Sequence, residues 1–226
     1  MNLDQLTQNL RQTLSQGEIR ATALPLAPEI SLLLIGDDYP RGRLPHDEMI
    51  AIMNRPAYWA FCWASGQVLA RYLIDHPQEV AGKTVLDFGA GSGVVAIAAR
   101  LAGAGRVIAC DNDPMAIDAT FANARLNGVD IEVVDDIDAI EGHIDVAIAA
   151  DVLYDRDNMG WLDRLPALAS EVLLADSRVK DVQVYGYEPI GRQTATTIPD
   201  LDELAEFNDV RLYRAIAVSK EVVQRD

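Results

Sequence analysis

The chain has 226 residues and half of them are hydrophobic, which is enough to bury the core of one domain and excludes disorder as a description of the whole. Its 35 acidic and 19 basic residues give a formal net charge of −16. A surface this acidic repels a phosphate backbone, so we expect no nucleic-acid partner. It is compatible with a basic substrate such as a lysine-bearing protein, although solubility is the more ordinary reason for such a charge.

The cysteines and histidines predict no metal site. Cys62 and Cys110 stand in no paired or metal-ligand spacing, which suits a reducing compartment, and the three histidines (His46, His76 and His143) are scattered. The first residues show no basic region followed by an apolar run. No uncharged apolar stretch approaches the ~18 residues needed to cross a bilayer. We therefore expect a cytoplasmic location and no membrane partner, and the oligomeric state stays open.

The N-terminal part is expected to be partly helical. Leucines recur at spacings of three and four in residues 1–16, which predicts a short amphipathic helix. Prolines punctuate the next segment, in which residues 30–35 could form a strand. A helix is then expected over residues 58–75, ending before Pro77.

From residue 83 onward, apolar strands alternate with helices, which predicts a parallel sheet covered on both faces. Residues 182–187 and 210–218 are expected to form an antiparallel strand pair at the far edge, with a short helix over residues 201–207 between them. The predicted fold class is α/β: a doubly wound, Rossmann-like sheet, mostly parallel with an antiparallel edge, after a short N-terminal helical extension. The other expected strands are residues 84–88, 106–110, 131–134, 144–149 and 172–175, and the helices are residues 94–102, 114–127 and 161–170.

A glycine-rich turn after the first of these strands is the strongest functional signal. Glycines there permit a tight turn and let a ligand approach the backbone without meeting a Cβ. Dinucleotide enzymes space them as Gly-x-Gly-x-x-Gly, whereas this chain has Gly89-Ala90-Gly91-Ser92-Gly93. Asp87 precedes the first glycine by two residues. A carboxylate there would repel a pyrophosphate and favour a ligand that carries a sulfonium and an α-ammonium.

A second carboxylate, Asp111, stands at the end of the next strand, 18 residues beyond Gly93. It can accept hydrogen bonds from both hydroxyls of an adenosine ribose, so it indicates a nucleoside without choosing between NAD and S-adenosylmethionine. The alternative is a turn residue that caps the following helix. Asp113, directly before Pro114, is the better cap.

Together these segments resemble the class I, seven-stranded S-adenosylmethionine-dependent methyltransferases. The resemblance covers about residues 57–187 and fades after Ser177. It rests on three segments: Leu86-Asp87-Phe88-Gly89-Ala90-Gly91-Ser92-Gly93, Asp111-Asn112-Asp113-Pro114 and Asn123-Ala124-Arg125-Leu126-Asn127-Gly128.

Two further segments are similar to the protein-lysine methyltransferases with a D-x-x-Y motif, in particular those acting on the electron-transfer flavoprotein beta subunit, whose bacterial relatives are often labelled nicotinamide N-methylase-like. They are Tyr58-Trp59-Ala60-Phe61-Cys62-Trp63-Ala64-Ser65-Gly66-Gln67 and Ala150-Asp151-Val152-Leu153-Tyr154. The resemblance implies that Trp63, Gly89, Gly91, Asp111 and Ala150 line the cofactor, while Asp151 and Tyr154 lie on the acceptor side. The full candidate cofactor-binding set is Trp63, Asp87, Gly89, Ala90, Gly91, Gly93, Asp111, Asn112, Asp135, Asp136 and Ala150.

Several of these residues have an ordinary structural alternative. Asp135 and Asp136 could bind the adenine amino group or be solvated turn carboxylates. Trp59 and Trp63 lie four residues apart, a spacing more often found in a core, and only the resemblance raises Trp63 above that expectation.

The acceptor chemistry is expected at the D-x-x-Y segment. Methyl transfer from a sulfonium requires a positioned nucleophile with a lone pair, and a lysine amine with a pKa near ~10.4 is mostly protonated at neutral pH. We expect Asp151 to orient the acceptor amine and Tyr154 to pack on its alkyl stem or make a cation–π contact. The alternative is that Asp151 caps a segment and Tyr154 is core. Val152-Leu153 replaces the two prolines of the Asn/Asp-Pro-Pro-Tyr motif, which makes planar amide acceptors less expected.

The predicted function is S-adenosylmethionine-dependent methylation of lysine in a protein substrate, with no metal. The alternatives are methylation of a small amine or nitrogen heterocycle, an NAD-dependent oxidoreductase and a non-catalytic binding module. The sequence leaves the acceptor and the number of methyl groups open. One domain is expected over residues 1–226: an N-terminal extension (1–56), a cofactor-binding core (57–187) and a C-terminal edge-strand region (188–226).

Overall fold

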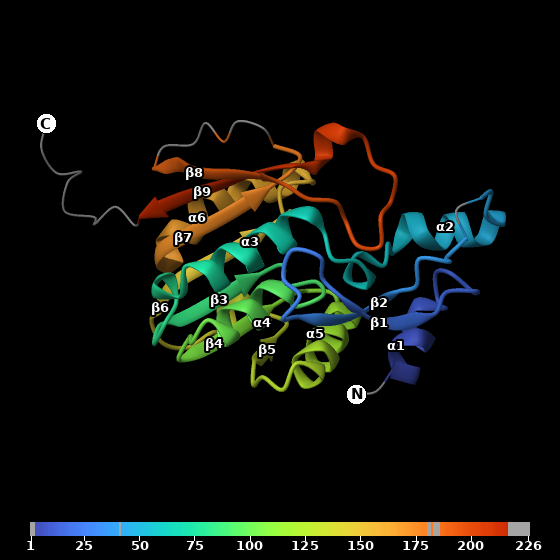
Figure 1. The fold of residues 1–226 in the computed structure, drawn as a ribbon, viewed down its shortest axis with the longest axis horizontal. Coiled ribbons are helices and arrows are strands. Elements are labelled where there is room, and N and C mark those ends of the chain that lie inside the picture. Colours follow the sequence, from blue (N-terminus) through green and yellow to red (C-terminus); the bar gives the residue numbers. More distant parts are fainter. Residues whose placement is uncertain (1–2, 41, 180–181, 183–185, 217–226) are drawn as a thin grey trace, which may run out of the picture.

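The computed structural model describes residues 3–40, 42–179, 182 and 186–216. It contains a two-stranded antiparallel sheet and a seven-stranded sheet with the strand order β5-β4-β3-β6-β7-β9-β8 (Figure 1). The strands are β1 (Ile19–Ala23), β2 (Ser31–Ile35), β3 (Thr84–Phe88), β4 (Arg106–Cys110), β5 (Glu132–Val134), β6 (Ile144–Ala150), β7 (Ala169–Asp176), β8 (Tyr187–Thr194) and β9 (Asp209–Ile216). The α-helices are α1 (Leu3–Leu10), α2 (His46–Asn54), α3 (Ala64–Asp75), α4 (Val94–Leu101), α5 (Pro114–Leu126) and α6 (Trp161–Leu168).

The large sheet has the topology expected from the sequence. Strands β3 to β7 run parallel, β9 pairs antiparallel with β7, and β8 pairs antiparallel with β9. After β3, the chain adds β4 and β5 on one side of it and then crosses to β6 and β7 on the other. The strand order therefore reverses at β3, and ligands of doubly wound sheets bind beyond the carboxyl ends of the strands at such a point.

Alternating apolar residues let the central strands bury both faces. Val85, in β3, belongs to the core on the side of α3 and α4, while its neighbour Leu86 belongs to the core that includes Leu162 and Leu165 of α6. The helices thus cover both faces of the sheet (Figure 1), as predicted.

The N-terminal extension is fastened to α5 by two asparagines. The amide of Asn127 bonds to both main-chain groups of Ser31, at 3.0 and 2.7 Å. Asn123 accepts a hydrogen bond of 2.6 Å from the N–H of Leu33. Because these bonds satisfy main-chain groups of β2, the small sheet packs on the body of the fold.

The predicted helix over residues 58–75 is interrupted. It begins as a single 3₁₀ turn, η1 (Tyr58–Ala60), and continues as α3 only from Ala64. Between them, Cys62 exchanges two main-chain hydrogen bonds of 2.8 Å with Ile198, which holds the chain extended there. These two residues are 136 positions apart, so nothing in the local sequence around Cys62 indicates their pairing. The prediction of one continuous helix over residues 58–75 was therefore wrong.

Other expectations at the ends of the chain need correction. The helix predicted over residues 1–16 ends at Leu10, and the one expected over residues 201–207 is a short 3₁₀ turn, η5 (Ala205–Asn208). The first antiparallel edge strand is Tyr187–Thr194, later than residues 182–187; Val182 is in no strand, and residues 183–185 lie outside the described part, as do 217–218 of the last predicted strand. Strand β1 and helix α2 were not expected.

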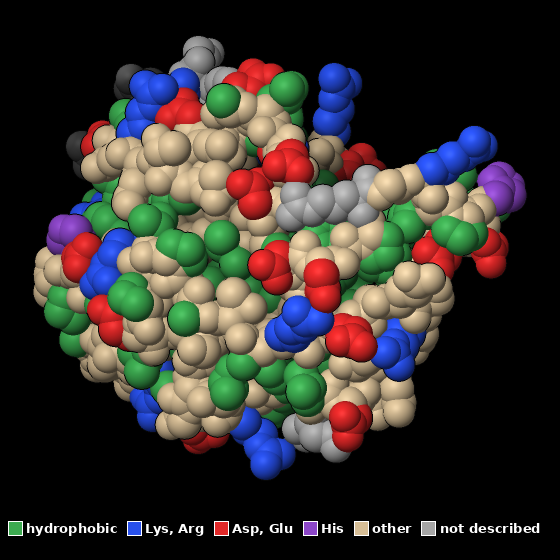
Figure 2. All heavy atoms as spheres, turned by 45° about the vertical axis from the view of Figure 1, so that its right-hand side comes forward, with side chains coloured by type: hydrophobic (Ala, Val, Ile, Leu, Met, Phe, Trp, Pro, Cys, Tyr) green, Lys and Arg blue, Asp and Glu red, His purple; other side chains and the backbone are tan. Residues whose placement is uncertain are grey.

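The described surface carries no single basic patch on the face shown in Figure 2, where basic side chains lie among acidic ones. Helix α2 projects from the body beyond β2, and none of its residues is buried (Figure 1). Among the described helices, none combines the length and the apolar character that a membrane span requires.

Candidate active site

The glycine-rich turn folds back onto the end of β4. The N–H groups of Gly89 and Ala90 both donate to the carbonyl of Cys110, at 2.9 and 3.1 Å. Gly89 has a φ of +70°, and a Cβ there would lie 2.8 Å from Val152 Cγ1. Gly91 has a φ of +55°, and a Cβ there would meet only one atom, at 3.9 Å. Gly91 thus leaves open space beside the backbone, as a ligand-binding turn requires.

Asp111 is tied directly to this turn. The N–H of Gly91 donates to its Oδ2 at 2.8 Å, and the N–H of Asp113 donates to its Oδ1 at 3.0 Å. A carboxylate has about four lone-pair sites, so Asp111 keeps acceptor capacity for an external donor. Burial is the main cause that raises the pKa of Asp111. Asp113 caps α5 by accepting from Met115 N at 2.9 Å, as predicted.

Asp87 lies beneath the turn and is 2 % exposed. Its Oδ2 accepts a hydrogen bond of 2.9 Å from the N–H of Ala96, in the first turn of α4. Burial raises the pKa of this carboxyl to about 7, although the Ala96 bond opposes the rise. Asp87 therefore supports the start of α4 and places a titratable group beneath the glycine-rich turn.

The two carboxylates after β5 differ in their surroundings. Both Asp135 and Asp136 are exposed. Asp136 Oδ1 accepts a hydrogen bond of 2.9 Å from the N–H of Asp138, and Asp136 is the N-cap of the turn η3 (Ile137–Ala139). Asp136 is therefore a turn carboxylate, which was the structural alternative to adenine binding. Asp135 stays the better candidate for the adenine amino group. Asn112, directly after Asp111, is exposed.

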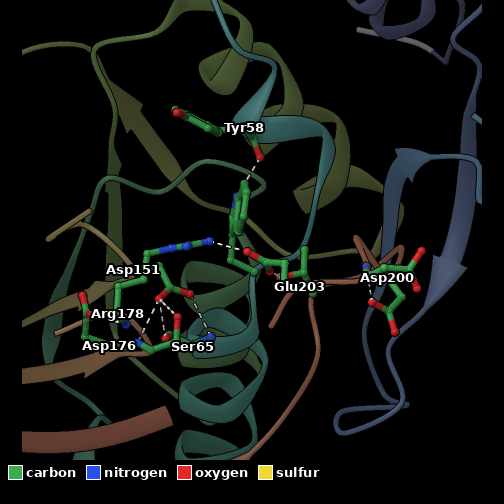
Figure 3. Close-up of polar contacts among 11 residues, drawn as sticks. Tyr58, Ser65, Asp151, Asp176, Arg178, Asp200 and Glu203 are labelled. Atoms are coloured by element: carbon green, nitrogen blue, oxygen red, sulfur yellow. Dashed lines mark hydrogen bonds and ion pairs between the residues drawn. The ribbon is translucent and has the colours of Figure 1, made fainter. Parts of the chain in front are cut away.

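Asp151 follows the last residue of β6, Ala150, and adopts a left-handed φ of +52°. Its Oδ2 accepts from the N–H of Ser65 at 2.9 Å. Its Oδ1 accepts three bonds, from the Ser65 hydroxyl (2.7 Å) and from the N–H and hydroxyl of Ser177 (3.1 and 2.8 Å). Figure 3 shows this convergence of Ser65 on Asp151. One carboxylate thus joins the ends of β6 and β7 to the start of α3.

Tyr154 is the second member of the D-x-x-Y motif and belongs to a group of rings. Its ring centroid lies 5.2 Å from that of Tyr58, which lies 5.6 Å from that of Trp63. Burial is the main cause that raises the pKa of Tyr154, and the Asp111 carboxylate contributes to the rise. Tyr154 therefore lies within electrostatic range of the candidate ribose site. Trp59, in contrast, is 1 % exposed and belongs to the core.

The segment after β7 lies beside the same aromatic rings. Asp176 is 1 % exposed, and burial raises its pKa to about 6. Arg178 pairs with Glu203 (Figure 3), and its guanidinium carbon lies 5.9 Å from the centroid of Trp63 and 4.5 Å from that of Phe207. The loop between β8 and β9 thereby reaches the site.

The structure brings most of the sequence-predicted residues to one edge of the sheet, where β3, β4 and β6 end. Sequence analysis did not find Tyr58, Ser65, Ser177 or Arg178 as site residues. Tyr58 and Ser65 lie within the segment similar to the family helix, which was the available signal. Within the described residues, no cluster of three or more His, Cys, Asp or Glu side chains could hold a metal ion.

Comparison with known proteins identifies methyltransferases. The family model of ribosomal protein L11 methyltransferase (PrmA) matches residues 69–155. The electron transfer flavoprotein beta subunit lysine methyltransferase of Rattus norvegicus is 38% identical over 135 residues, covering 58% of this chain and 52% of that protein. Its Xenopus laevis counterpart is 36% identical over 164 residues, covering 69% and 65%. The chain thus spans about half the length of the first curated relatives it matches.

A solved structure shows the same fold. The N-methyltransferase NodS from Bradyrhizobium japonicum, in complex with S-adenosyl-L-homocysteine, matches 68% of this chain and 86% of its own with a TM-score of 0.51 and 16% identity. The resemblance read from the motifs is confirmed: this chain has the fold of the class I S-adenosylmethionine-dependent methyltransferases, and its sequence is similar to those of the electron transfer flavoprotein beta subunit lysine methyltransferases.

Proposed function

We propose that this chain is an S-adenosylmethionine-dependent N-methyltransferase that methylates lysine side chains of a protein substrate. One observation carries the proposal: the bond between Gly91 N–H and Asp111 Oδ2 lies at the same sheet edge as Asp151 and Tyr154. A nucleoside site and an acceptor site are thus side by side. The similarity to lysine methyltransferases supports the choice of acceptor.

The residues present fit the co-substrate. When bound, S-adenosylmethionine supplies an electrophilic methyl group on a sulfonium. Asp111 keeps acceptor capacity for a ribose hydroxyl, and Gly91 leaves room for a nucleoside against the backbone. Asp87 adds negative charge beneath a cationic ligand. The residues proposed to line it are Trp63, Asp87, Gly89, Ala90, Gly91, Gly93, Asp111, Asn112, Asp135 and Ala150.

The acceptor amine would be oriented by one oxygen of Asp151. Oδ1 already accepts three hydrogen bonds, whereas Oδ2 accepts one, from Ser65 N–H. Oδ2 therefore retains a lone pair for an amine N–H and would direct the nitrogen lone pair toward the methyl group. A lysine ammonium must lose its proton before transfer, and Asp151 is the carboxylate proposed to accept that proton, directly or through a water molecule.

Composition alone supports three further proposals: a cytoplasmic location, no nucleic-acid partner and no membrane partner. They rest on the absence of a basic or spanning segment in the sequence and on the net charge of −16.

The direct test incubates the protein with methyl-labelled S-adenosylmethionine and purified electron transfer flavoprotein, followed by mass spectrometry of the beta subunit. Labelled lysine in that subunit supports the proposal. A parallel reaction with cell lysate separates the alternatives, because label in a small metabolite indicates a small-amine methyltransferase. Absence of label in every fraction, from protein that binds S-adenosylhomocysteine, would contradict the proposal. Asp151→Ala is the matched variant and should lose transfer.

A further inference from the structure

We propose that Tyr58, together with Trp63 and Tyr154, forms a subsite that binds the alkylammonium side chain of the acceptor before transfer. This inference rests on the proposed function and adds a residue that neither the motif nor the comparisons assign. Tyr58 belongs to the 3₁₀ turn η1, far in sequence from the D-x-x-Y segment.

The three rings form a continuous wall. Tyr58 stands between the other two, with centroid distances of 5.6 Å to Trp63 and 5.2 Å to Tyr154 and interplanar angles of 71° and 62°. Edge-to-face packing of this kind leaves ring faces available to a third group. An alkyl chain can lie against such faces, and its terminal cation is attracted by their negative quadrupoles.

Two of the three rings of this wall are exposed. Tyr58 is 43 % exposed and Tyr154 is 53 % exposed, whereas Trp59, one residue from Tyr58, is 1 % exposed. Fold stability therefore explains the burial of Trp59 and leaves the exposure of the two tyrosines unexplained. A contiguous exposed apolar patch can mark a binding site.

The backbone fixes Tyr58 in this position independently of its ring. The indole Nε1 of Trp63 donates to the main-chain carbonyl of Tyr58 at 3.0 Å, and this bond is drawn in Figure 3. The N–H of Phe61 also donates to that carbonyl, at 3.3 Å. Removal of the Tyr58 ring would therefore leave the turn and the Trp63 indole in place.

Charge determines which occupant fits. Asp111 lies close enough to contribute to the raised pKa of Tyr154, behind burial and Tyr58, and Asp151 is three residues away in the same segment. Arg178, a basic side chain 5.9 Å from the centroid of Trp63, is paired with Glu203. Aromatic faces near a carboxylate suit a cation on an apolar stem, which describes a lysine side chain.

The experiment titrates the protein, saturated with S-adenosylhomocysteine, with n-butylammonium and measures binding by saturation-transfer NMR. The neutral isostere n-butanol is the ligand control. We expect saturable binding of n-butylammonium that is tighter than that of n-butanol. Tyr58→Ala should weaken it by about threefold or more, and Tyr58→Phe should retain it because the ring face remains. Phe121→Ala removes an aromatic ring that is also 43 % exposed, on α5, and should change nothing.

The outcomes separate the two proposals. Failure of the native protein to bind S-adenosylhomocysteine contradicts the proposed function itself. Binding of S-adenosylhomocysteine with equal n-butylammonium affinity in the native protein and Tyr58→Ala, or with no saturable binding at all, overturns only the subsite. Retained S-adenosylhomocysteine affinity in Tyr58→Ala shows that the variant is folded.

Discussion

Asp151 and Ser65 are joined by two hydrogen bonds that connect the end of β6 to the first turn of α3. The N–H of Ser65 donates to Oδ2 at 2.9 Å and its hydroxyl donates to Oδ1 at 2.7 Å. The N-cap residue of α3 is Trp63, whose side chain makes no capping bond. The Asp151 carboxylate supplies that missing acceptor, and its charge is favourable at the positive end of the helix. Asp151 thus positions α3 and Trp63, besides its proposed contact with the acceptor amine.

Ser65→Ala tests this positioning role while leaving the carboxylate in place. Loss of one hydroxyl donor to a charged acceptor should lower the free energy of unfolding by about 1–2 kcal/mol. We also expect kcat to fall several-fold, because Oδ1 loses a partner that fixes the orientation of the carboxylate. Urea unfolding and steady-state methyl transfer measure the two effects. Ser170→Ala removes an exposed hydroxyl that is hydrogen-bonded to His143 Nε2 at 3.0 Å, away from Asp151, and should alter neither. An unchanged kcat in Ser65→Ala would show that the bond is structural only.

Gly91→Ala should weaken the binding of S-adenosylhomocysteine. The backbone at Gly91 has a φ of +55°, which costs a non-glycine residue about 1–2 kcal/mol, and the new methyl group would project into the space proposed for the nucleoside. Gly128→Ala is the matched control, because Gly128, at the end of α5, has a φ of +67° and a Cβ there meets nothing within 4 Å. Calorimetry should find weaker binding for Gly91→Ala alone, with similar losses of stability in both. Equal affinities in the two variants would remove Gly91 from the site.

Asp87 should make the stability of the fold depend on pH. Its pKa is raised by burial from an ordinary 3.8 to about 7. Between these values the folded chain keeps a proton that the unfolded chain has lost, so this group lowers the free energy of unfolding as the pH rises from about 4 to about 7. Asp87→Asn should abolish this contribution and be more stable than the native protein at pH 8 by about 1–3 kcal/mol, but not at pH 4.

The same substitution should weaken S-adenosylmethionine binding at pH 8, because it removes a negative charge from beneath a cationic ligand. Urea unfolding at the two pH values and calorimetry at pH 8 check both effects. A difference in stability that is the same at pH 4 and pH 8 would contradict the raised pKa.

Asn123 couples the N-terminal extension to the glycine-rich turn. It is fully buried, its Nδ2 donates to the carbonyl of Ser92 at 2.8 Å, and its Oδ1 accepts from Leu33 N–H at 2.6 Å. Asn123→Ala removes the hydrogen bonds to the carbonyl of Ser92 and the N–H of Leu33 and should cost about 2–4 kcal/mol of unfolding free energy. Asn127→Ala, which detaches Ser31 but does not touch the turn, is the control. Only Asn123→Ala should also reduce S-adenosylhomocysteine affinity; an equal reduction in both would indicate a general loss of packing.

The parallel core could be predicted from the sequence because its signals are local. Strands such as Thr84–Phe88 are short apolar runs bounded by turn residues, and Asp113-Pro114 marks the start of α5 directly. The features that could not be predicted depend on contacts between residues that are distant in sequence. Cys62 is extended because it pairs with Ile198. Ser65 contributes to the site because the first turn of α3 lies against Asp151, which follows β6. Asp151 caps a helix, though not the one that follows it, and its role toward the acceptor amine stays a prediction.

The most direct test of an S-adenosylmethionine site at the glycine-rich turn and Asp111 is calorimetric titration of the native protein. The ligand is S-adenosylhomocysteine, and NAD is the competing nucleotide. We expect one-to-one binding of S-adenosylhomocysteine and no binding of NAD. We also expect a large loss of affinity in Asp111→Asn, because this substitution replaces one acceptor oxygen of the carboxylate by an amide donor. Protein that unfolds cooperatively but gives no heat with S-adenosylhomocysteine, or that binds NAD instead, would contradict such a site.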